Sequence, residues 1–282
     1  MSDKIEPLHA VVTGATGFVG RHVVSNLIAN GYQVLLLARN VEKAKGIPGL
    51  NGSSISYFDI SKNGPLPALP PNGVLVHCSW DNVRDTQSIK HIEEHLLRNF
   101  FFVKKAVEQG IKKVLVTGTC YEYGLQSGPV SALTPTMPNT PYALAKDTLH
   151  KALRQLQSKA DFQLIWARLF YMYGAGQDEN SIVPLFDAAL ERGDKVFNMS
   201  LGEQLLDFLP VEKVAEQLHA LLSYDDGVYN VCSGKPISLR RFLEQRMKDK
   251  NKHIDLNLGY YEYRKQDSLA IWGTDPITSK VR

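Results

Sequence analysis

The residues Thr13-Gly14-Ala15-Thr16-Gly17-Phe18-Val19-Gly20 decide the fold, because they join a short apolar run to an amphipathic one. Their glycines follow the spacing GxxGxxG. The first glycine permits a tight turn, the second lets the backbone approach a pyrophosphate at a helix N-terminus, and the third allows close packing of helix on strand. Glycine triplets also occur in plain turns, but the position of this one at the first strand–helix junction predicts a dinucleotide-binding turn.

Short apolar runs alternate with helical patterns on both sides of this turn. The pattern predicts strands at residues 9–13, 33–38, 54–60, 74–78, 113–117 and 163–170, and helices from the glycine turn to Gly31, over 89–109 and over 140–159. This alternation predicts an α/β protein with a Rossmann-type, doubly wound parallel sheet covered on both faces. Residues 63–73 contain four prolines, so we expect a loop there in place of a crossover helix.

The chain of 282 residues is long enough for a main core and a smaller appended lobe. We expect residues 1–174 to form an NAD(P)-binding domain. Residues 175–282 have a looser pattern, with helices expected at 182–192, 211–222 and 239–248. We expect them to form mostly a small C-terminal substrate-binding lobe, with some segments returning to the main sheet.

The composition excludes several classes of protein. Hydrophobic residues make up 44% and charged residues 22%, which argues against a disordered or fibrous chain, and a net charge of +3 without a basic run argues against nucleic-acid binding. No apolar run approaches the roughly 20 residues that span a bilayer, so we expect no membrane contact. The N-terminus lacks an apolar signal region, so we expect a cytoplasmic protein. The three scattered cysteines indicate neither a metal site nor a disulfide framework.

The end of the second predicted strand bears on the choice of cofactor. An acidic residue there would accept hydrogen bonds from the adenosine ribose of NAD, but the position 18 residues after Gly20 is Ala38, and Arg39 follows. Because an arginine suits a 2′-phosphate, we expect NADP(H) to be preferred over NAD(H). Asp59, at the end of the third predicted strand, contacts the adenine or caps the following turn.

A tyrosine and a lysine lie four positions apart in Tyr142-Ala-Leu-Ala-Lys146, on one face of a predicted helix. A nearby ammonium favours the phenolate, so the hydroxyl of Tyr142 is suited to exchange a proton with a carbonyl group. The spacing alone is weak evidence, because Tyr261 and Lys265 repeat it. The first pair is distinguished by Thr119, 23 residues before Tyr142 and just beyond the fifth predicted strand, at the edge where open α/β sheets bind ligands.

Together these segments resemble the extended short-chain dehydrogenase/reductases, in the nucleotide-sugar branch. The resemblance rests on the TGATGFVG turn, on Thr119-Cys-Tyr-Glu-Tyr-Gly124 and on YALAK. It continues through Arg168-Leu-Phe-Tyr-Met-Tyr-Gly174 and through Asp207-Phe208 with the following V..VA block, and so covers nearly the whole chain in order.

The resemblance implies roles for individual residues. Tyr142 would be the general acid/base, Lys146 would bind the nicotinamide ribose and depress the tyrosine pKa, and Thr119 would hydrogen-bond the substrate oxygen. The implied cofactor-binding residues are Gly14, Thr16, Gly17, Phe18, Val19, Gly20, Arg39, Asp59, Ile60, Cys78, Ser79, Asn99, Tyr142, Lys146 and Leu169. The implied substrate-binding residues are Trp80, Cys120, Tyr121, Tyr171 and Arg264.

Departures from the family pattern narrow the expected reaction. The 4,6-dehydratases have an Asp-Glu pair where Cys120 and Tyr121 stand here, so dehydration is not expected, and we interpret Cys120 as buried packing. NAD-retaining 4-epimerases usually carry the acidic residue that Ala38 replaces. We therefore predict an NAD(P)H-dependent reductase of the 4-keto group of an NDP-4-keto-6-deoxyhexose. The alternatives are an epimerase of the same family and a non-catalytic NADP(H)-binding regulator, although such regulators typically lose the Tyr/Lys pair.

Other departures concern the substrate and the oligomeric state. The family's arginine before Asp-Phe is replaced by Leu206, so we expect Arg264 to hold more of the nucleotide diphosphate, unless it is only a surface charge. Ser79, Trp80 and Asp81 follow the fourth strand and would line the sugar pocket, although Trp80 is equally suited to the core. His77 would pack against the cofactor. A homodimer is common in the family, and residues 100–102, three phenylalanines, serve either a dimer interface or the core.

Overall fold

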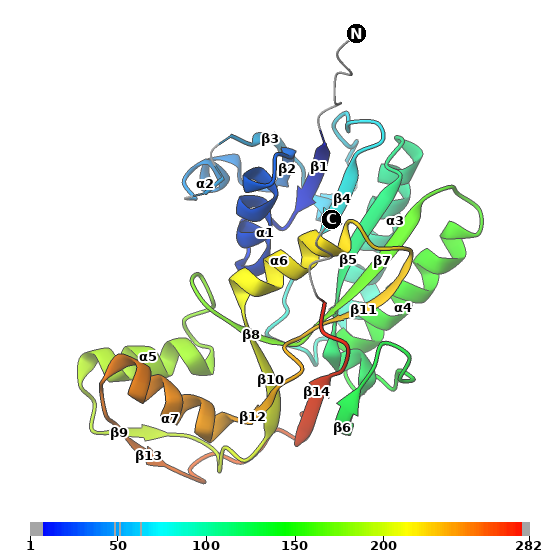
Figure 1. The fold of residues 1–282 in the computed structure, drawn as a ribbon. Coiled ribbons are helices and arrows are strands. Elements are labelled where there is room, and N and C mark those ends of the chain that lie inside the picture. The colour runs from blue at the N-terminus through cyan, green and yellow to red at the C-terminus, as the bar shows by residue number, and fades with distance from the viewer. Residues whose placement is uncertain (1–7, 48, 51, 63, 278–282) are drawn as a thin grey trace.

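The computed structural model describes residues 8–277 except 48, 51 and 63. Among these residues, seven parallel strands form the main sheet in the order β11-β7-β5-β4-β1-β2-β3 (Figure 1). The strands are β1 (His9–Thr13), β2 (Gln33–Ala38), β3 (Ser54–Tyr57), β4 (Val74–His77), β5 (Lys113–Thr119), β7 (Gln163–Leu169) and β11 (Gly227–Val231). The Rossmann-type, doubly wound sheet predicted from the sequence is therefore confirmed.

Helices cover both faces of this sheet (Figure 1). On one face, α1 (Phe18–Ala29) and α6 (Val211–Leu221) pack against each other and share one hydrophobic core with the strands. On the other face, α3 (Leu96–Glu108) and α4 (Pro141–Gln157) pack together over a second core that includes Trp166. Burial on both faces explains why the strand sequences are continuous apolar runs rather than alternating ones.

A second, smaller group of elements is formed by β6 and by most of the elements that follow β7. The strand β10 (Leu205–Pro210) pairs with β8 (Tyr171–Tyr173), β12 (Pro236–Ser238) and β14 (Ala270–Gly273), and β14 also pairs with β6 (Ser127–Val130). Beside this sheet, α5 (Ile182–Arg192) and α7 (Leu239–Lys250) pack together with the paired strands β9 (Val196–Asn198) and β13 (Asp255–Asn257) around a separate hydrophobic core. Two later elements are not part of this smaller group: β11 is a strand of the main sheet, and α6 packs on that sheet.

Beyond shifts of one or two residues at the ends of elements, the structure differs from the predicted elements at the third strand, at the helix over 89–109 and after β2. The third strand ends at Tyr57, before residue 60. The helix predicted over 89–109 begins with a π-helical turn at His91–His95 and continues as α3. A short helix, α2 (Val41–Lys45), follows β2 and was not expected, because five residues give no periodic signal. Residues 64–73 contain no helix, as the prolines predict.

Asp207 of β10 ties the two groups of strands together. Its carboxylate is fully buried and accepts hydrogen bonds from the backbone N–H and hydroxyl of Ser233, which follows β11, at 2.7 and 2.6 Å. It also accepts from the N–H of Gly234 at 2.9 Å and from that of Gly273, in β14, at 3.3 Å. A buried carboxylate with these charge-assisted bonds fixes the junction between the sheets.

We expect Asp207→Asn to lower the free energy of unfolding by about 2–3 kcal/mol, because an amide NH₂ replaces one acceptor oxygen and faces N–H donors. Urea denaturation monitored by circular dichroism measures the change. The control is Asp255→Asn, at an exposed position, which should stay within about 0.5 kcal/mol of wild type. Equal stabilities of the two variants would contradict the role assigned to Asp207.

Candidate active site

The glycine turn brings two backbone segments closer than side chains allow. A Cβ on Gly14 would lie 2.8 Å from the backbone of Cys78 and Ser79, and a Cβ on Gly20 would lie 2.1 Å from the Gly14 carbonyl oxygen. Gly17, the N-cap of α1, offers no side-chain cap, and the first turn of α1 has no acidic residue. The free N–H groups at this helix terminus therefore fit a pyrophosphate.

The carboxyl ends of the parallel strands meet at the edge where this turn lies. Thr13, Ala38, His77, Thr119 and Leu169 all stand at strand ends along this edge. The structure thus brings together the elements that carry most of the predicted cofactor and catalytic residues.

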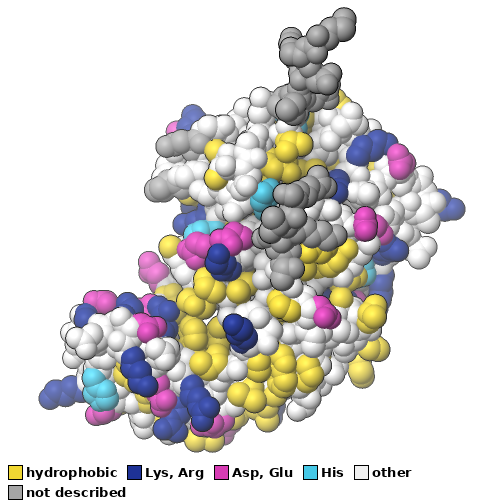
Figure 2. Space-filling view, viewed as in Figure 1, with side chains coloured by type: hydrophobic (Ala, Val, Ile, Leu, Met, Phe, Trp, Pro, Cys, Tyr) yellow, Lys and Arg dark blue, Asp and Glu magenta, His cyan; other side chains and the backbone are white. Residues whose placement is uncertain are grey.

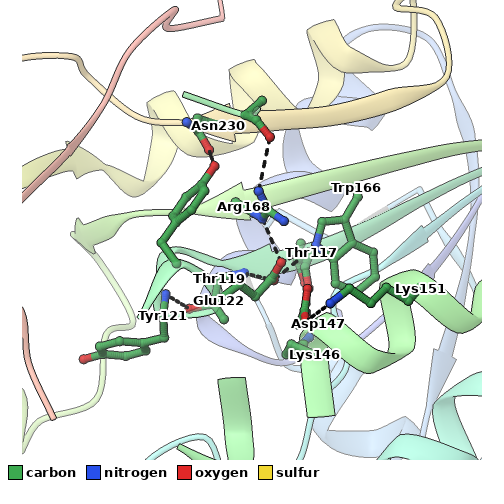
Figure 3. Close-up of polar contacts among 12 residues, drawn as sticks. Thr117, Thr119, Tyr121, Glu122, Lys146, Asp147, Lys151, Trp166, Arg168 and Asn230 are labelled. Atoms are coloured by element: carbon green, nitrogen blue, oxygen red, sulfur yellow. Dashed lines mark hydrogen bonds and ion pairs between the residues drawn. The ribbon is translucent and has the colours of Figure 1, made fainter. Parts of the chain in front are cut away.

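Thr119 is held by a buried ion pair behind it (Figure 3). The carboxylate of Glu122 accepts the Thr119 backbone N–H at 2.8 Å and the Arg168 side-chain N–H at 2.7 Å. It also accepts from the indole of Trp166 at 3.0 Å. The Thr119 hydroxyl accepts the N–H of Tyr121, so Thr119 and Glu122 together form a capping box at the N-terminus of the short 3₁₀ turn Cys120–Tyr123. The ion pair therefore fixes the strand end that carries the hydroxyl.

Tyr142 and Lys146 lie in the first turns of α4, which begins with Thr140 as N-cap and Pro141 as its first residue. Lys146 is almost fully buried, and its ammonium donates to the Thr117 carbonyl oxygen at 2.8 Å. The ammonium also lies 4.2 Å from the centre of the Trp80 ring. Tyr142 hydrogen-bonds the Thr119 side chain, so the predicted catalytic residues are brought together.

The predicted depression of the Tyr142 pKa is wrong for this structure. Burial raises the pKa of the Tyr142 hydroxyl, the negative charge of Glu122 adds to the shift, and the hydrogen bond with Thr119 only partly opposes it. The ammonium of Lys146 is directed to Thr117 and Trp80, and burial lowers its own pKa to about 8. Tyr142 is therefore held in its neutral, proton-donating form.

Asn99, predicted to bind the cofactor, has both polar ends of its buried side chain occupied by protein. Its oxygen lies 2.7 Å from Nε2 of His77, and its NH₂ donates to the His95 carbonyl oxygen at 2.6 Å. Nδ1 of His77 lies 2.7 Å from the Thr13 hydroxyl, and burial lowers the pKa of this imidazole to about 3. Neutral His77 and Asn99 thus connect β1 and β4 to α3.

Arg39 is not free at the adenosine end of the edge. Its guanidinium forms an ion pair with Asp81 at 2.9 Å, and both side chains are partly exposed. Asp81, expected in the sugar pocket, is therefore engaged at the end of β2 instead. Asp59 accepts hydrogen bonds from the N–H and hydroxyl of Ser61, so its side chain caps the following turn, one of the two roles considered for it.

The predicted substrate residues gather where the C-terminal segment returns past β8. The hydroxyl of Tyr121 donates to Asp267 at 3.3 Å, and its ring packs edge-on against Tyr171. Burial raises the pKa of Asp267, and the charge of Arg264 opposes that shift. Arg264 is exposed but close enough to act on this cluster, whereas Cys120 and Leu206 are buried in one hydrophobic core.

Sequence reasoning missed three residues that make contacts around the site. They are Glu122, Asp267 and His91, which accepts the indole N–H of Trp80. Glu122 lies inside the motif quoted for the resemblance, where a charged residue among apolar neighbours is a signal for a buried ion pair. The other two give no local signal, because their partners lie on other elements.

Comparison with known proteins establishes the family. The model of the NAD dependent epimerase/dehydratase family matches residues 10–232. This chain belongs to that family. It is 31% identical over 274 residues to a dTDP-6-deoxy-L-talose 4-dehydrogenase (NAD(+)) from Aggregatibacter actinomycetemcomitans, covering 94% of this chain and 99% of the relative. That relative and a CDP-abequose synthase from Salmonella typhimurium, 22% identical over 247 residues, covering 83% of this chain and 78% of the relative, are both named for reactions of nucleotide sugars.

Solved structures of similar fold support the architecture. A UDP-N-acetylglucosamine 4-epimerase from Methanobrevibacter ruminantium superimposes with a TM-score of 0.83 at 23% identity, covering 96% of this chain and 90% of that one. MoeE5, solved in complex with UDP-glucuronic acid and NAD, superimposes with a TM-score of 0.79 at 22% identity, covering 95% and 90%. At these identities the likeness shows the fold.

None of the helices in residues 8–277, the three gaps excepted, is long and apolar enough to cross a membrane. Within the same part of the chain, no group of three or more histidine, cysteine, aspartate or glutamate side chains is placed to hold a metal ion.

Burial of Lys146 predicts an effect on stability. The folded state loses the Lys146 proton near pH 8, whereas the unfolded chain keeps it to about 10.5, so the buried cation destabilises the fold at neutral pH. We expect Lys146→Met to raise the free energy of unfolding at pH 7 by about 1–3 kcal/mol. The fall of the Lys146 pKa from 10.5 to about 8 sets the upper end of this range, because one pKa unit corresponds to about 1.4 kcal/mol. This gain in the free energy of unfolding should shrink as the pH rises from about 8 to about 10.5, because folded wild type no longer carries the buried charge there.

Urea denaturation at several pH values measures this effect. Lys265→Met, at an exposed lysine, is the control and should show no such pH dependence. A less stable Lys146→Met variant at pH 7 would mean that the bond to Thr117 outweighs the cost of burying the charge.

Proposed function

We propose that this protein is an NAD(P)H-dependent reductase of the 4-keto group of a nucleotide-linked 4-keto-6-deoxyhexose. The main support is the arrangement of Thr119, Tyr142 and Lys146 at the strand edge, with Tyr142 held neutral as a proton donor. The relative named as a 4-dehydrogenase of a deoxyhexose performs, by its name, the same hydride transfer written in the opposite direction.

The chain's residues supply the acid and its orientation. The glycine turn would hold a reduced nicotinamide cofactor, which would supply the hydride for reduction of the carbonyl group. Thr119 donates a hydrogen bond to the carbonyl oxygen, and Tyr142 transfers its proton to that oxygen as negative charge develops there. Lys146, on the same helix as Tyr142, would bind the nicotinamide ribose, and the Glu122–Arg168 pair keeps Thr119 in place.

The alternative enzyme is an epimerase of the same substrates. It would retain its cofactor and consume no NADPH, whereas a reductase consumes one equivalent for each sugar reduced. Incubation with NADPH or NADH and a panel of NDP-4-keto-6-deoxyhexoses, followed by absorbance of the reduced cofactor, separates the two. Cofactor binding without turnover of any sugar would favour the regulator.

We expect Tyr142→Phe to lower kcat by roughly 10²–10⁴-fold, because the proton donor is lost. Cofactor affinity should change little, since the ring remains. The matched control is Tyr261→Phe, which removes a hydroxyl from the exposed second pair and should be nearly neutral. Turnover of Tyr142→Phe at the wild-type rate would refute the assignment.

We further propose that the cofactor is NADP(H) rather than NAD(H). Ala38 leaves the end of β2 without a carboxylate, and Arg39 is exposed there. The ion pair of Arg39 with Asp81 competes with a 2′-phosphate, so Asp81 limits the preference.

We therefore expect opposite effects from two substitutions. Arg39→Ala should weaken NADPH by about 10-fold and leave NADH nearly unchanged, because one charge-assisted hydrogen bond is lost. Asp81→Asn should strengthen NADPH, because the guanidinium is released. Titration of cofactor fluorescence measures both, and equal use of the two cofactors by wild type would refute the NADP(H) proposal.

A homodimer through α3 and α4 is the last part of this proposal. Phe102 is buried in the core of the sheet, but Leu97 and Phe101 of α3 and Leu144 of α4 are exposed although apolar. An apolar face on two adjacent helices suits contact with a second copy. Analytical ultracentrifugation of wild type and Phe101→Glu tests it, and a wild-type monomer would contradict it.

A further inference from the structure

A histidine outside the predicted site packs against the catalytic tyrosine. His91 lies in the π-helical turn that precedes α3 and is fully buried. Its ring centre is 5.2 Å from that of Tyr142, and it stacks beside Trp80 at 6.3 Å. The imidazole rings of His91 and His95 both pack against Trp80, which follows β4. The π-helical turn thus places both histidines beside the active site.

The hydrogen bonds of His91 define its tautomer. The indole N–H of Trp80 can only donate, and it lies 3.0 Å from Nδ1 of His91, which must therefore accept. Nε2 then carries the proton and donates it to the Asp85 carbonyl oxygen at 2.9 Å. Nδ1 of His95 lies 3.2 Å from the same Nδ1 of His91. His91 is thus held at both nitrogens, and it in turn fixes the plane of the Trp80 ring.

The same Trp80 ring also meets the catalytic lysine. The ammonium of Lys146 lies 4.2 Å from the ring centre, and the edge of Tyr142 lies against the same ring at 6.1 Å between centres. A cation over an indole face is attracted by the ring quadrupole, and the attraction strengthens in a desolvated site. The position of the ring therefore contributes to the position of the ammonium.

We propose that His91 is a positioning residue of the active site: through its hydrogen bond to Trp80, it holds the indole against the Lys146 ammonium. This rests on the proposed function for its effect on turnover. Its effect on cofactor binding rests only on the place of Lys146 at the strand edge. Without the acceptor, the partly buried indole N–H loses its partner on His91, so the ring turns toward a new partner and leaves the ammonium.

The test compares substitutions that remove or keep the acceptor. His91→Phe keeps a ring but not the acceptor, and we expect kcat to fall about 5- to 20-fold and cofactor to bind about 3- to 10-fold more weakly. The KM of the sugar should change less than 2-fold. His91→Gln keeps an amide oxygen for the indole N–H, so it should recover most of both losses. His219→Phe is the matched control, because His219 packs edge-on against Tyr32 on the opposite face of the sheet.

A double-mutant cycle separates positioning from general packing. Trp80→Phe keeps an aromatic face over Lys146 but lacks the N–H, so His91→Phe should have little further effect in its background. Additive losses, or a His91→Gln variant as impaired as His91→Phe, would overturn the proposal. If no sugar is reduced, the proposed function is wrong, and cofactor affinities across the same cycle still decide the role of His91.

Discussion

The buried carboxylate of Glu122 is the constraint on which the catalytic edge depends. It receives N–H groups from Thr119, Trp166 and Arg168, and so joins the ends of two adjacent central strands to the turn between them. An unpaired charge at full burial would be very costly, so Arg168 is required as its partner. The pair fixes the strand end that carries Thr119, whose side chain hydrogen-bonds Tyr142 of α4.

Burial also determines which side chains of the site carry a charge. Burial favours the neutral form of Tyr142 and of His77, and it draws the pKa of Lys146 toward the physiological range. The lysine is retained although its burial opposes folding, which is the pattern of a group kept for chemistry. Figure 2 shows abundant apolar surface over the region of β10 and β14. The charged groups of the site, in contrast, lie within the molecule at the strand edge.

Much of the fold and part of the site followed from local patterns. The glycine turn and the apolar runs predicted the parallel sheet, and the four prolines predicted the missing crossover helix. The YALAK segment located Tyr142 and Lys146, because spacing along a helix is a local property. The pKa of Tyr142 was predicted in the wrong direction, since the sequence shows that a lysine is near but not where its ammonium points.

The sequence by itself determined the order of elements, the glycine turn and the pairing of Tyr142 with Lys146 on one helix, because each depends on residues a few positions apart. The tertiary structure alone decided which distant side chains meet. It paired Arg39 with Asp81, enclosed Asn99 between His77 and His95, and set Trp80 between His91 and Lys146. Such contacts join different strands and helices, so their geometry depends on how the layers pack and leaves no periodic trace along the chain.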